Sequence, residues 1–315
     1  MRIVRKDFVA DGMMPTKECH ASTLVEDRNG RIMIAWFGGT REGQPDVRIW
    51  FSVLDNGRWS EPRTIAAVRE VQHWNPVLFY TDENTLTLYY KVGAPIAEWQ
   101  TYYTETSDFG QTWAEPRELV EGDVDGGRGP VKNKPIFTRE GRLLAPASVE
   151  NVKPWRAFVD IFDGCEWQKS EIPTREGDGV SLIQPTLFEL KDGSLGALMR
   201  SDGERVYISR SYDGGLSWSE ARPTELPNNN SGIDCTIGKN GELFVVCNPV
   251  GKNWGVRTPL SVYSSRDGGE SFEHLVDLET AEGEYSYPAM ISVENGIAVS
   301  YTHKRERVAF AVIEL

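Results

Sequence analysis

The chain has 315 residues, of which 39% are hydrophobic and 26% charged, and its formal net charge is -13. These proportions are typical of a globular protein. The acidic balance argues against nucleic acid as a partner, because phosphate binding needs a basic surface. No stretch is long and apolar enough to span a membrane as a helix, so we expect no membrane partner.

The amino-terminal segment and the cysteines indicate the compartment in which the protein works and whether it binds a metal or cofactor. Residues 1–7 contain no apolar segment of the kind found in signal peptides. We therefore expect a cytoplasmic protein, or a secreted or periplasmic one whose leader has been removed. The four cysteines form no CxxC pair and the four histidines lack zinc-site spacing. We expect mostly buried thiols, no metal and no cofactor.

A turn motif that ends in an aromatic residue recurs along the chain. Its final aromatics are separated by 54, 54, 51 and 54 residues, a period that indicates a repeat architecture. The motif resembles an Asp-box: the Asp accepts backbone N–H bonds, the glycines adopt positive φ, and the aromatic packs between strands. We expect these turns to be structural and to lie far from any central site. The copies span residues 54–59, 107–113, 162–167, 211–218 and 265–272.

Each repeat unit also carries short alternating apolar runs. In the fourth unit these runs cover residues 185–190, 194–199 and 205–211, separated by turns that contain Asp and Gly. Such runs indicate strands in hairpins, and no window shows a comparable helical stripe. Three or four strands in about 54 residues is the size of a propeller blade.

The two ends of the chain complete one further unit. Residues 289–293, 297–301 and 308–313 supply three strands of a sixth blade, and residues 2–9 can supply its fourth. This closure would leave no open sheet edge. We therefore predict an all-β fold, a single six-bladed β-propeller domain over residues 1–315 with Asp-box hairpins, whose last blade is closed by the N-terminal strand.

A polar residue opens the first strand of every unit. In a propeller these innermost strands surround the axis, so the six residues should form a ring at one mouth of the central channel. Six polar side chains in register indicate a ligand site there. The ring consists of His20, Asn75, Lys134, Gln184, Asp234 and Tyr287.

Arginines and carboxylates near this ring suggest the chemistry of the ligand. Arg41, Arg200 and Arg257 each lie at or near the end of a strand. Because a guanidinium group binds a carboxylate through its planar fork, these arginines favour an anionic sugar as ligand. Glu42 and Asp46 lie in the loop after Arg41, and either is a candidate general acid.

Five short motifs make the chain similar to a known family. It resembles the sialidase (neuraminidase) superfamily, in the sialidase-like branch with BNR or Asp-box repeats. The resemblance implies three arginines that hold the substrate carboxylate, an Asp acid/base, and a Tyr nucleophile paired with a Glu. It matches Arg200 and Arg257 to the second and third arginines, Tyr287 to the nucleophile and Asp46, or Glu42, to the acid. The motifs span residues 19–23, 36–40, 132–135, 230–234 and 285–288.

Two positions depart from the pattern of this family. The first arginine falls on His20, and the Glu that activates the tyrosine falls on Gln184. A glutamine side chain accepts no proton, so Gln184 cannot activate Tyr287 as a carboxylate would.

Three functions therefore stay open. In an exo-acting glycoside hydrolase for a terminal acidic sugar, Arg200 and Arg257 would hold the carboxylate with help from Lys134. Asp46 or Glu42 would protonate the leaving oxygen, and Tyr287 would attack with His20 or Asp234 as its base. In a polysaccharide lyase that acts on a uronic acid, Tyr287 or His20 would move the proton. In a non-catalytic glycan-binding propeller, the ring would serve recognition alone. In each case the expected partner is an acidic sugar or oligosaccharide.

Overall fold

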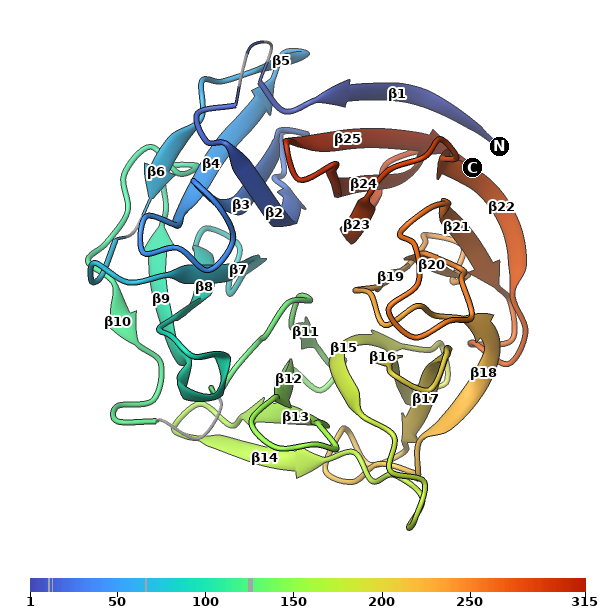
Figure 1. Ribbon diagram of the computed structural model, residues 1–315. Helices are drawn as coiled ribbons and strands as arrows, with labels where there is room; N and C mark the ends of the chain where they lie inside the picture. The colour runs from blue at the N-terminus through green and yellow to red at the C-terminus, as the bar shows by residue number, and fades with distance from the viewer. Residues whose placement is uncertain (11, 13, 66, 124–126) are drawn as a thin grey trace.

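Six antiparallel sheets stand around a common axis in the computed structural model, which describes residues 1–10, 12, 14–65, 67–123 and 127–315 (Figure 1). The first strand of each sheet lies nearest the axis, and the following strands lie progressively further out. The prediction of an all-β, six-bladed propeller is confirmed. Within the described ranges the helical structure is the short segment η1 (Ile96–Glu98), and no helix there is long and apolar enough to cross a membrane.

The first three blades follow one another along the chain. Blade 1 contains β2 (Glu18–Glu26), β3 (Ile32–Gly39), β4 (Arg48–Asp55), β5 (Arg58–Trp59) and β6 (Arg63–Ile65). Blade 2 contains β7 (His73–Tyr80), β8 (Leu86–Val92), β9 (Gln100–Thr106) and β10 (Arg117–Glu118). Blade 3 contains β11 (Ile136–Phe137), β12 (Leu143–Val149), β13 (Arg156–Phe162) and β14 (Trp167–Glu171).

The last three blades complete the ring. Blade 4 contains β15 (Leu182–Glu189), β16 (Leu195–Ser201), β17 (Arg205–Ser211) and β18 (Arg222–Pro227). Blade 5 contains β19 (Asp234–Ile237), β20 (Leu243–Cys247), β21 (Leu260–Ser265) and β22 (Glu273–Glu279). Blade 6 contains β23 (Tyr285–Val293), β24 (Gly296–His303), β25 (Arg307–Glu314) and β1 (Arg2–Phe8).

Blade 6 joins the two ends of the chain. Strand β1 pairs antiparallel with β25, from Arg2 opposite Glu314 to Phe8 opposite Ala309. The termini lie side by side at the outer edge of this blade (Figure 1). Because the N-terminal strand is the outermost strand of a sheet whose other strands come from the C-terminus, the predicted closure is confirmed.

The repeated Asp turns hold themselves together through their own side chains. Asp267 accepts hydrogen bonds from the backbone N–H of Ser271 at 3.0 Å and from the hydroxyl of Ser265 at 2.8 Å. Asp213 makes the same contacts with its own turn. These turns follow the third strand of a blade, which runs parallel to the first strand. They therefore lie on the face opposite to the one where the inner strands begin.

Hydrophobic clusters fill five of the seams between blades. They join blades 1 and 2, 3 and 4, 4 and 5, 5 and 6, and 6 and 1. Turn aromatics contribute to four of them, namely Trp59, Trp113, Trp218 and Phe272. Trp113 packs against Phe51 and Trp59 against Phe310, with ring centroids 5.6 and 5.4 Å apart. Edge-to-face packing of this kind stabilises such cores.

The seam between blades 2 and 3 combines apolar packing of Phe79 against Phe137, with ring centroids 5.4 Å apart, with a buried polar network. Lys91 donates hydrogen bonds to Thr101 Oγ1 at 2.7 Å and to the carbonyl of Arg128 at 3.1 Å. The guanidinium of Arg128 then makes a bidentate pair with the fully buried Asp160 at 2.9 and 2.7 Å. This network anchors the segment that follows Gly127, which runs toward the axis of the propeller.

Candidate active site

Four inner strands share an unusual backbone residue close to their start. Ala21, Asn75, Gln184 and Tyr287 have φ angles of 50°, 41°, 51° and 49°. Each coincides with a register shift in the pairing between the first and second strands of its blade. A bulge of this kind re-aims the local side chains and is common beside active sites, where the surrounding fold supports the strain. Four strained residues in register mark this end of the channel.

The bulges also correct the ring predicted from the sequence. In blade 1 the equivalent of Asn75, Gln184 and Tyr287 is Ala21, so His20 was aligned one residue too early. In blades 3 and 5 the ladder pairings place Lys132 and Gly232 at this level. A Cβ atom at Gly232 would lie 3.2 Å from Lys132 Cε and 3.5 Å from Tyr287 Cγ.

Lys134 and Asp234 accordingly lie two residues deeper along the axis than predicted. Lys134 Nζ is 3.1 Å from Asp234 Oδ2, and Asp234 also accepts bonds from the Thr186 hydroxyl and the Met290 N–H. Burial raises the pKa of Asp234, but Lys134 and Lys132 outweigh burial and keep it below its usual value. With all these partners, Asp234 ties blades 3, 4, 5 and 6 together and is poorly placed to serve Tyr287 as a base.

A cavity of about 440 Å³ is lined by Lys134 and Asp234. Its lining also includes the far ends of the inner strands, at Phe79, Glu189 and Ser292. Tyr287, by contrast, stands near the start of its strand. The predicted ring is therefore divided between two levels of the channel.

Three side chains meet at the level of the channel where the inner strands begin, namely those of Tyr287, Arg200 and Gln184. Arg200 Nη1 donates to the Tyr287 hydroxyl oxygen at 2.7 Å and to Gln184 Oε1 at 3.3 Å, and Gln184 Nε2 is 3.5 Å from the same hydroxyl. Arg200 is itself 3% exposed and is fixed by a 2.8 Å bond from Nε to Asn230 Oδ1. The side chains of blades 4 and 6 thus meet across the axis.

Arg257 approaches the same tyrosine from blade 5. Its guanidinium carbon lies 5.6 Å from the centroid of the Tyr287 ring, and that of Arg200 lies 5.8 Å from it. Two guanidinium groups from neighbouring blades therefore lie close to one phenol ring. Such a pair can attract an anionic group to the space above the ring.

His20 packs against Tyr287 although it is not the bulged residue. The two ring centroids are 4.2 Å apart, and His20 is 2% exposed. Burial lowers the pKa of His20 well below its usual value, and Arg305, Arg257, Arg200 and Lys132 add to the shift. His20 is therefore neutral and a weak base. Its Nδ1 atom has no hydrogen-bond partner among the residues that the structure describes.

Arg305 is a site residue that the sequence did not reveal. It lies in the turn between β24 and β25, and its Nε donates to both carboxylate oxygens of Glu284 at 3.0 and 3.1 Å. Its Nη1 pairs with Glu42. Glu284 also accepts from Arg257 Nη1 at 2.7 Å. Because the connections between the second and third strands differ in length and sequence from blade to blade, the alignment of repeats gave no signal for it.

The loop after β3 holds the remaining predicted residues of blade 1. Arg41 and Asp46 are exposed there, and Glu42 is engaged by Arg305. Asp46 accepts hydrogen bonds from the hydroxyl and, at 2.9 Å, the N–H of Thr40. These bonds, the one from the hydroxyl foremost, lower the pKa of Asp46. A lowered pKa is the opposite of what a general acid needs near neutral pH.

Glu150 is the second residue that the sequence did not reveal. It follows the last residue of β12, and burial raises its pKa, with Arg200 and Lys91 opposing the shift. A carboxyl group with this shift retains its proton to higher pH, as a general acid requires. The sequence gave no hint because Glu150 belongs to no recurring motif.

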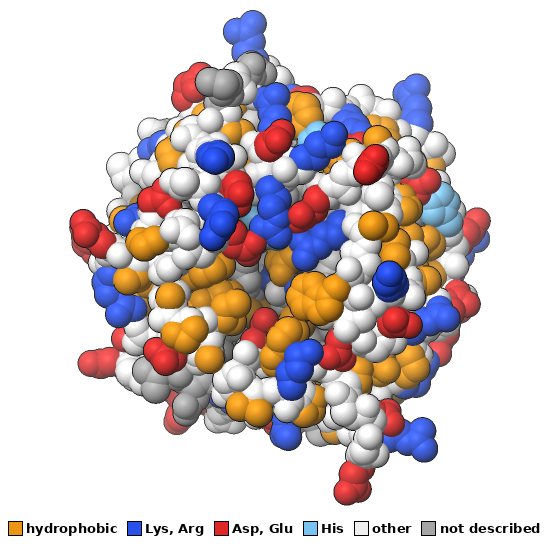
Figure 2. Space-filling view, in the orientation of Figure 1, with side chains coloured by type: hydrophobic (Ala, Val, Ile, Leu, Met, Phe, Trp, Pro, Cys, Tyr) orange, Lys and Arg blue, Asp and Glu red, His pale blue; other side chains and the backbone are white. Residues whose placement is uncertain are grey.

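The surface around the axis reflects this distribution of charge. Figure 2 shows a central hollow with Lys, Arg, Asp and Glu side chains gathered along one side of it and hydrophobic side chains on the others. Within the described ranges, no group of three or more His, Cys, Asp or Glu residues is arranged to hold a metal ion.

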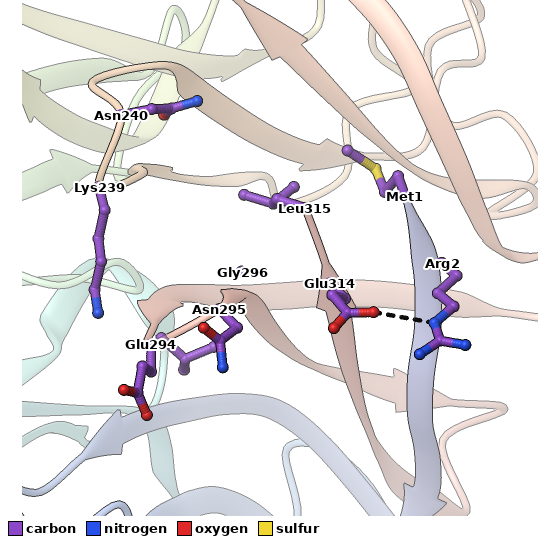
Figure 3. Close-up of a pocket in the computed structure, with 10 residues that line it drawn as sticks. Met1, Arg2, Lys239, Asn240, Glu294, Asn295, Gly296, Glu314 and Leu315 are labelled. Atoms are coloured by element: carbon purple, nitrogen blue, oxygen red, sulfur yellow. Dashed lines mark hydrogen bonds and ion pairs between the residues drawn. The ribbon is translucent and has the colours of Figure 1, made fainter.

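A separate cavity of about 520 Å³ lies between blades 5 and 6 (Figure 3). It is lined by the turn Glu294-Asn295-Gly296, by Lys239 and by both chain ends, where Arg2 pairs with Glu314 at 3.0 Å. The turn lies at the opposite end of β23 from Tyr287. This cavity is therefore distinct from the candidate active site.

A propeller with this centre belongs to the sialidase-like class of folds, and comparison with solved structures supports that assignment. A protein of unknown function from Dyadobacter fermentans superposes with a TM-score of 0.81 at 17% identity, over 100% of this chain and 99% of the other. The NanB sialidase of Streptococcus pneumoniae gives 0.74 at 13%, over 97% and 70%. The intramolecular trans-sialidase of Ruminococcus gnavus gives 0.71 at 13%, over 99% and 98%.

The sequence comparisons identify the family. Residues 30–299 match the BNR repeat-like domain, and the chain belongs to this family. No curated protein sequence matches the chain. At these identities the solved structures establish the shared fold, and the chemistry has to be argued from the residues of this site.

Proposed function

We propose that the protein is an exo-acting glycoside hydrolase that removes a terminal acidic sugar, sialic acid or a related one, from a glycan. The observation that carries the proposal is the placement of Arg200 and Arg257 close to Tyr287, with Arg200 Nη1 2.7 Å from the tyrosine hydroxyl. Solved structures with this fold include a sialidase and a trans-sialidase, which supports the same substrate class.

In the proposed reaction, the guanidinium group of Arg200 holds the sugar carboxylate above the Tyr287 ring. The hydroxyl of Tyr287 then faces the anomeric carbon, where it attacks or stabilises the oxocarbenium-like transition state. Glu150 is our candidate for the proton donor to the leaving oxygen, since burial raises its pKa whereas hydrogen bonding lowers that of Asp46. Glu42, from the same loop as Asp46, is paired with Arg305 and is therefore less suited to donate a proton.

One observation favours a second candidate, a lyase that acts on a uronic acid. The hydroxyl of Tyr287 makes its hydrogen bonds with Arg200 and Gln184, and no carboxylate contacts it within the described part of the chain. A tyrosine without a carboxylate partner is less suited to nucleophilic attack. In a lyase, Arg200 would neutralise the uronate carboxylate while Tyr287 moved the proton, a mechanism that needs no Glu.

Two substrates distinguish these functions. Fluorophore release from a methylumbelliferyl sialoside supports hydrolysis, and an unsaturated product from a uronate oligosaccharide, detected by its ultraviolet absorbance, supports the lyase. Tyr287→Phe should abolish either activity, whereas Tyr212→Phe, on a side chain that is 81% exposed, should leave it unchanged. Binding of both sugars without turnover would contradict both enzymes and favour a glycan-binding propeller.

A further inference from the structure

The arginines around Tyr287 differ in how far the protein already neutralises them. Arg257 Nη1 lies 2.7 Å from Glu284, and Arg305 lies 3.0 Å from the same carboxylate and also pairs with Glu42. Arg200, by contrast, bonds only to the neutral groups of Asn230, Gln184 and Tyr287 among the described residues. The three arginines are therefore not equivalent receptors for an anion.

We propose that Glu284 sets the specificity of this site by occupying Arg257 and Arg305 from within the protein, which leaves Arg200 to receive a single sugar carboxylate. This inference rests on the proposed function, since it assumes an acidic sugar as ligand, and it narrows the substrate class. The site selects sugars with one carboxylate and does not favour more highly charged ones, such as sulfated uronates.

The local charges support this difference between Arg200 and the other two arginines. Arg257 and Arg305 carry two positive charges, and Glu284 and Glu42 carry two negative ones at contact distance. All four side chains are at least partly buried, with exposed fractions of 16% for Arg257 and 31% for Glu284, so solvent screens their pairing incompletely. Arg200 remains as the arginine without an acidic partner, and its side chain is the most deeply buried of the three.

The position of Glu284 makes this arrangement stable. It immediately precedes β23, three residues before Tyr287, and also accepts a bond from the Ser286 hydroxyl at 3.2 Å. Burial raises the pKa of Glu284, but Arg257 and Arg305 outweigh burial and lower it. Glu284 therefore stays ionised through the neutral range, and the two arginines stay neutralised.

Calorimetric binding of a methyl sialoside and a methyl glucuronide to Glu284→Gln tests this proposal. Glutamine has the same shape without the charge, so Arg257 and Arg305 become available to the ligand. We expect the affinity for both acids to rise about tenfold, with a steeper dependence on salt. The methyl esters of the same sugars should bind as they do to the wild type, because they carry no charge.

Two further variants separate this effect from general changes. Glu282→Gln removes the same charge two residues earlier, where the described structure shows no arginine partner, and should leave both affinities within about twofold of wild type. Adding Arg305→Gln to Glu284→Gln should cancel most of the gain. Thermal melts of each variant show whether the fold is intact.

Distinct outcomes bear on the two proposals. Unchanged acid binding by Glu284→Gln, or an equal rise for acid and ester, would overturn the role of Glu284. Failure of wild type and variant alike to bind either acid would count against both proposals. Acid binding that responds to Glu284→Gln without any turnover would reject hydrolysis and leave the role of Glu284 standing.

Discussion

Asp160→Asn should destabilise the propeller at the seam between blades 2 and 3. Oδ2 of Asp160 accepts two hydrogen bonds, from Arg128 Nε at 2.9 Å and from the Gly129 N–H at 2.8 Å, and Oδ1 accepts a third from Arg128 Nη2 at 2.7 Å. Either orientation of an amide would place its NH₂ group against at least one of these donors. The guanidinium of Arg128, whose side chain is 16% exposed, would lose its anionic partner.

The expected cost follows from this burial. Breaking a buried ion pair by removing one charge costs about 3–5 kcal/mol. At roughly 2–4 °C per kcal/mol, the melting temperature should fall by about 6–20 °C. The change should also loosen the segment that carries Lys132 and Asn133 to the axis, because Arg128 and Gly129 begin it.

Thermal denaturation followed by circular dichroism measures this effect, with Glu105→Gln as the control. Glu105 pairs with Arg117 at 3.0 Å, but the two side chains are 34% and 62% exposed, so the loss should stay within about 1 kcal/mol. A melting temperature for Asp160→Asn equal to that of Glu105→Gln would refute the reasoning that this polar network holds the seam.

The remaining predictions concern carboxyl groups that donate, release or accept a proton. Glu150→Gln should lower kcat/KM by about 100-fold and remove the alkaline limb of its pH profile, whereas Glu140→Gln on an exposed turn should not; an unchanged limb would exclude Glu150 as the acid. The Thr112 hydroxyl and N–H and the Thr106 hydroxyl lower the pKa of Asp108 to about 2, so its contribution to stability is present above about pH 4 and is lost toward pH 2. Asp108→Asn should therefore flatten the loss of stability in this window, as seen in melts at several pH values. Gln184→Glu should raise sialoside hydrolysis at least about tenfold, because it places a carboxylate beside the Tyr287 hydroxyl, and a loss of activity would count against Tyr287 as nucleophile.

The architecture could be predicted because it repeats in the sequence. The period of the turn aromatics and the alternation of the strands are local signals, and each recurs several times. Even the closure by residues 2–9 followed from counting strands in the last unit. The packing of Trp59 and Trp113 between blades then follows from the same spacing.

The level of each side chain along the axis could not be predicted in the same way. A bulge adds one residue to the inner strand, and the sequence does not mark it in blade 1, where Ala21 stands at the place of Asn75. A one-residue shift changes which face a strand side chain occupies. His20 was misaligned for this reason. Lys134 and Asp234 were misaligned by two residues, because the strand start used to align the units does not fall at the same level in every blade.

Contacts between residues of distant turns could not be predicted from the sequence either. Arg305 meets Glu42 across 263 residues of chain, and the two residues lie in the corresponding turns of blades 6 and 1, which differ in length and sequence. The raised pKa of Glu150 depends on burial by neighbouring blades, which no local pattern records. Such contacts are set by the closed ring itself.

The most direct test of the central claim is hydrolysis of a methylumbelliferyl sialoside by wild type and by Arg200→Lys. Lysine keeps the positive charge but loses the planar fork and the bond that fixes it to Asn230. The account predicts fluorophore release by the wild type and a reduction of kcat/KM by about 10- to 100-fold in the variant. Equal activity of the two proteins would contradict the placement of the sugar carboxylate on Arg200 above Tyr287.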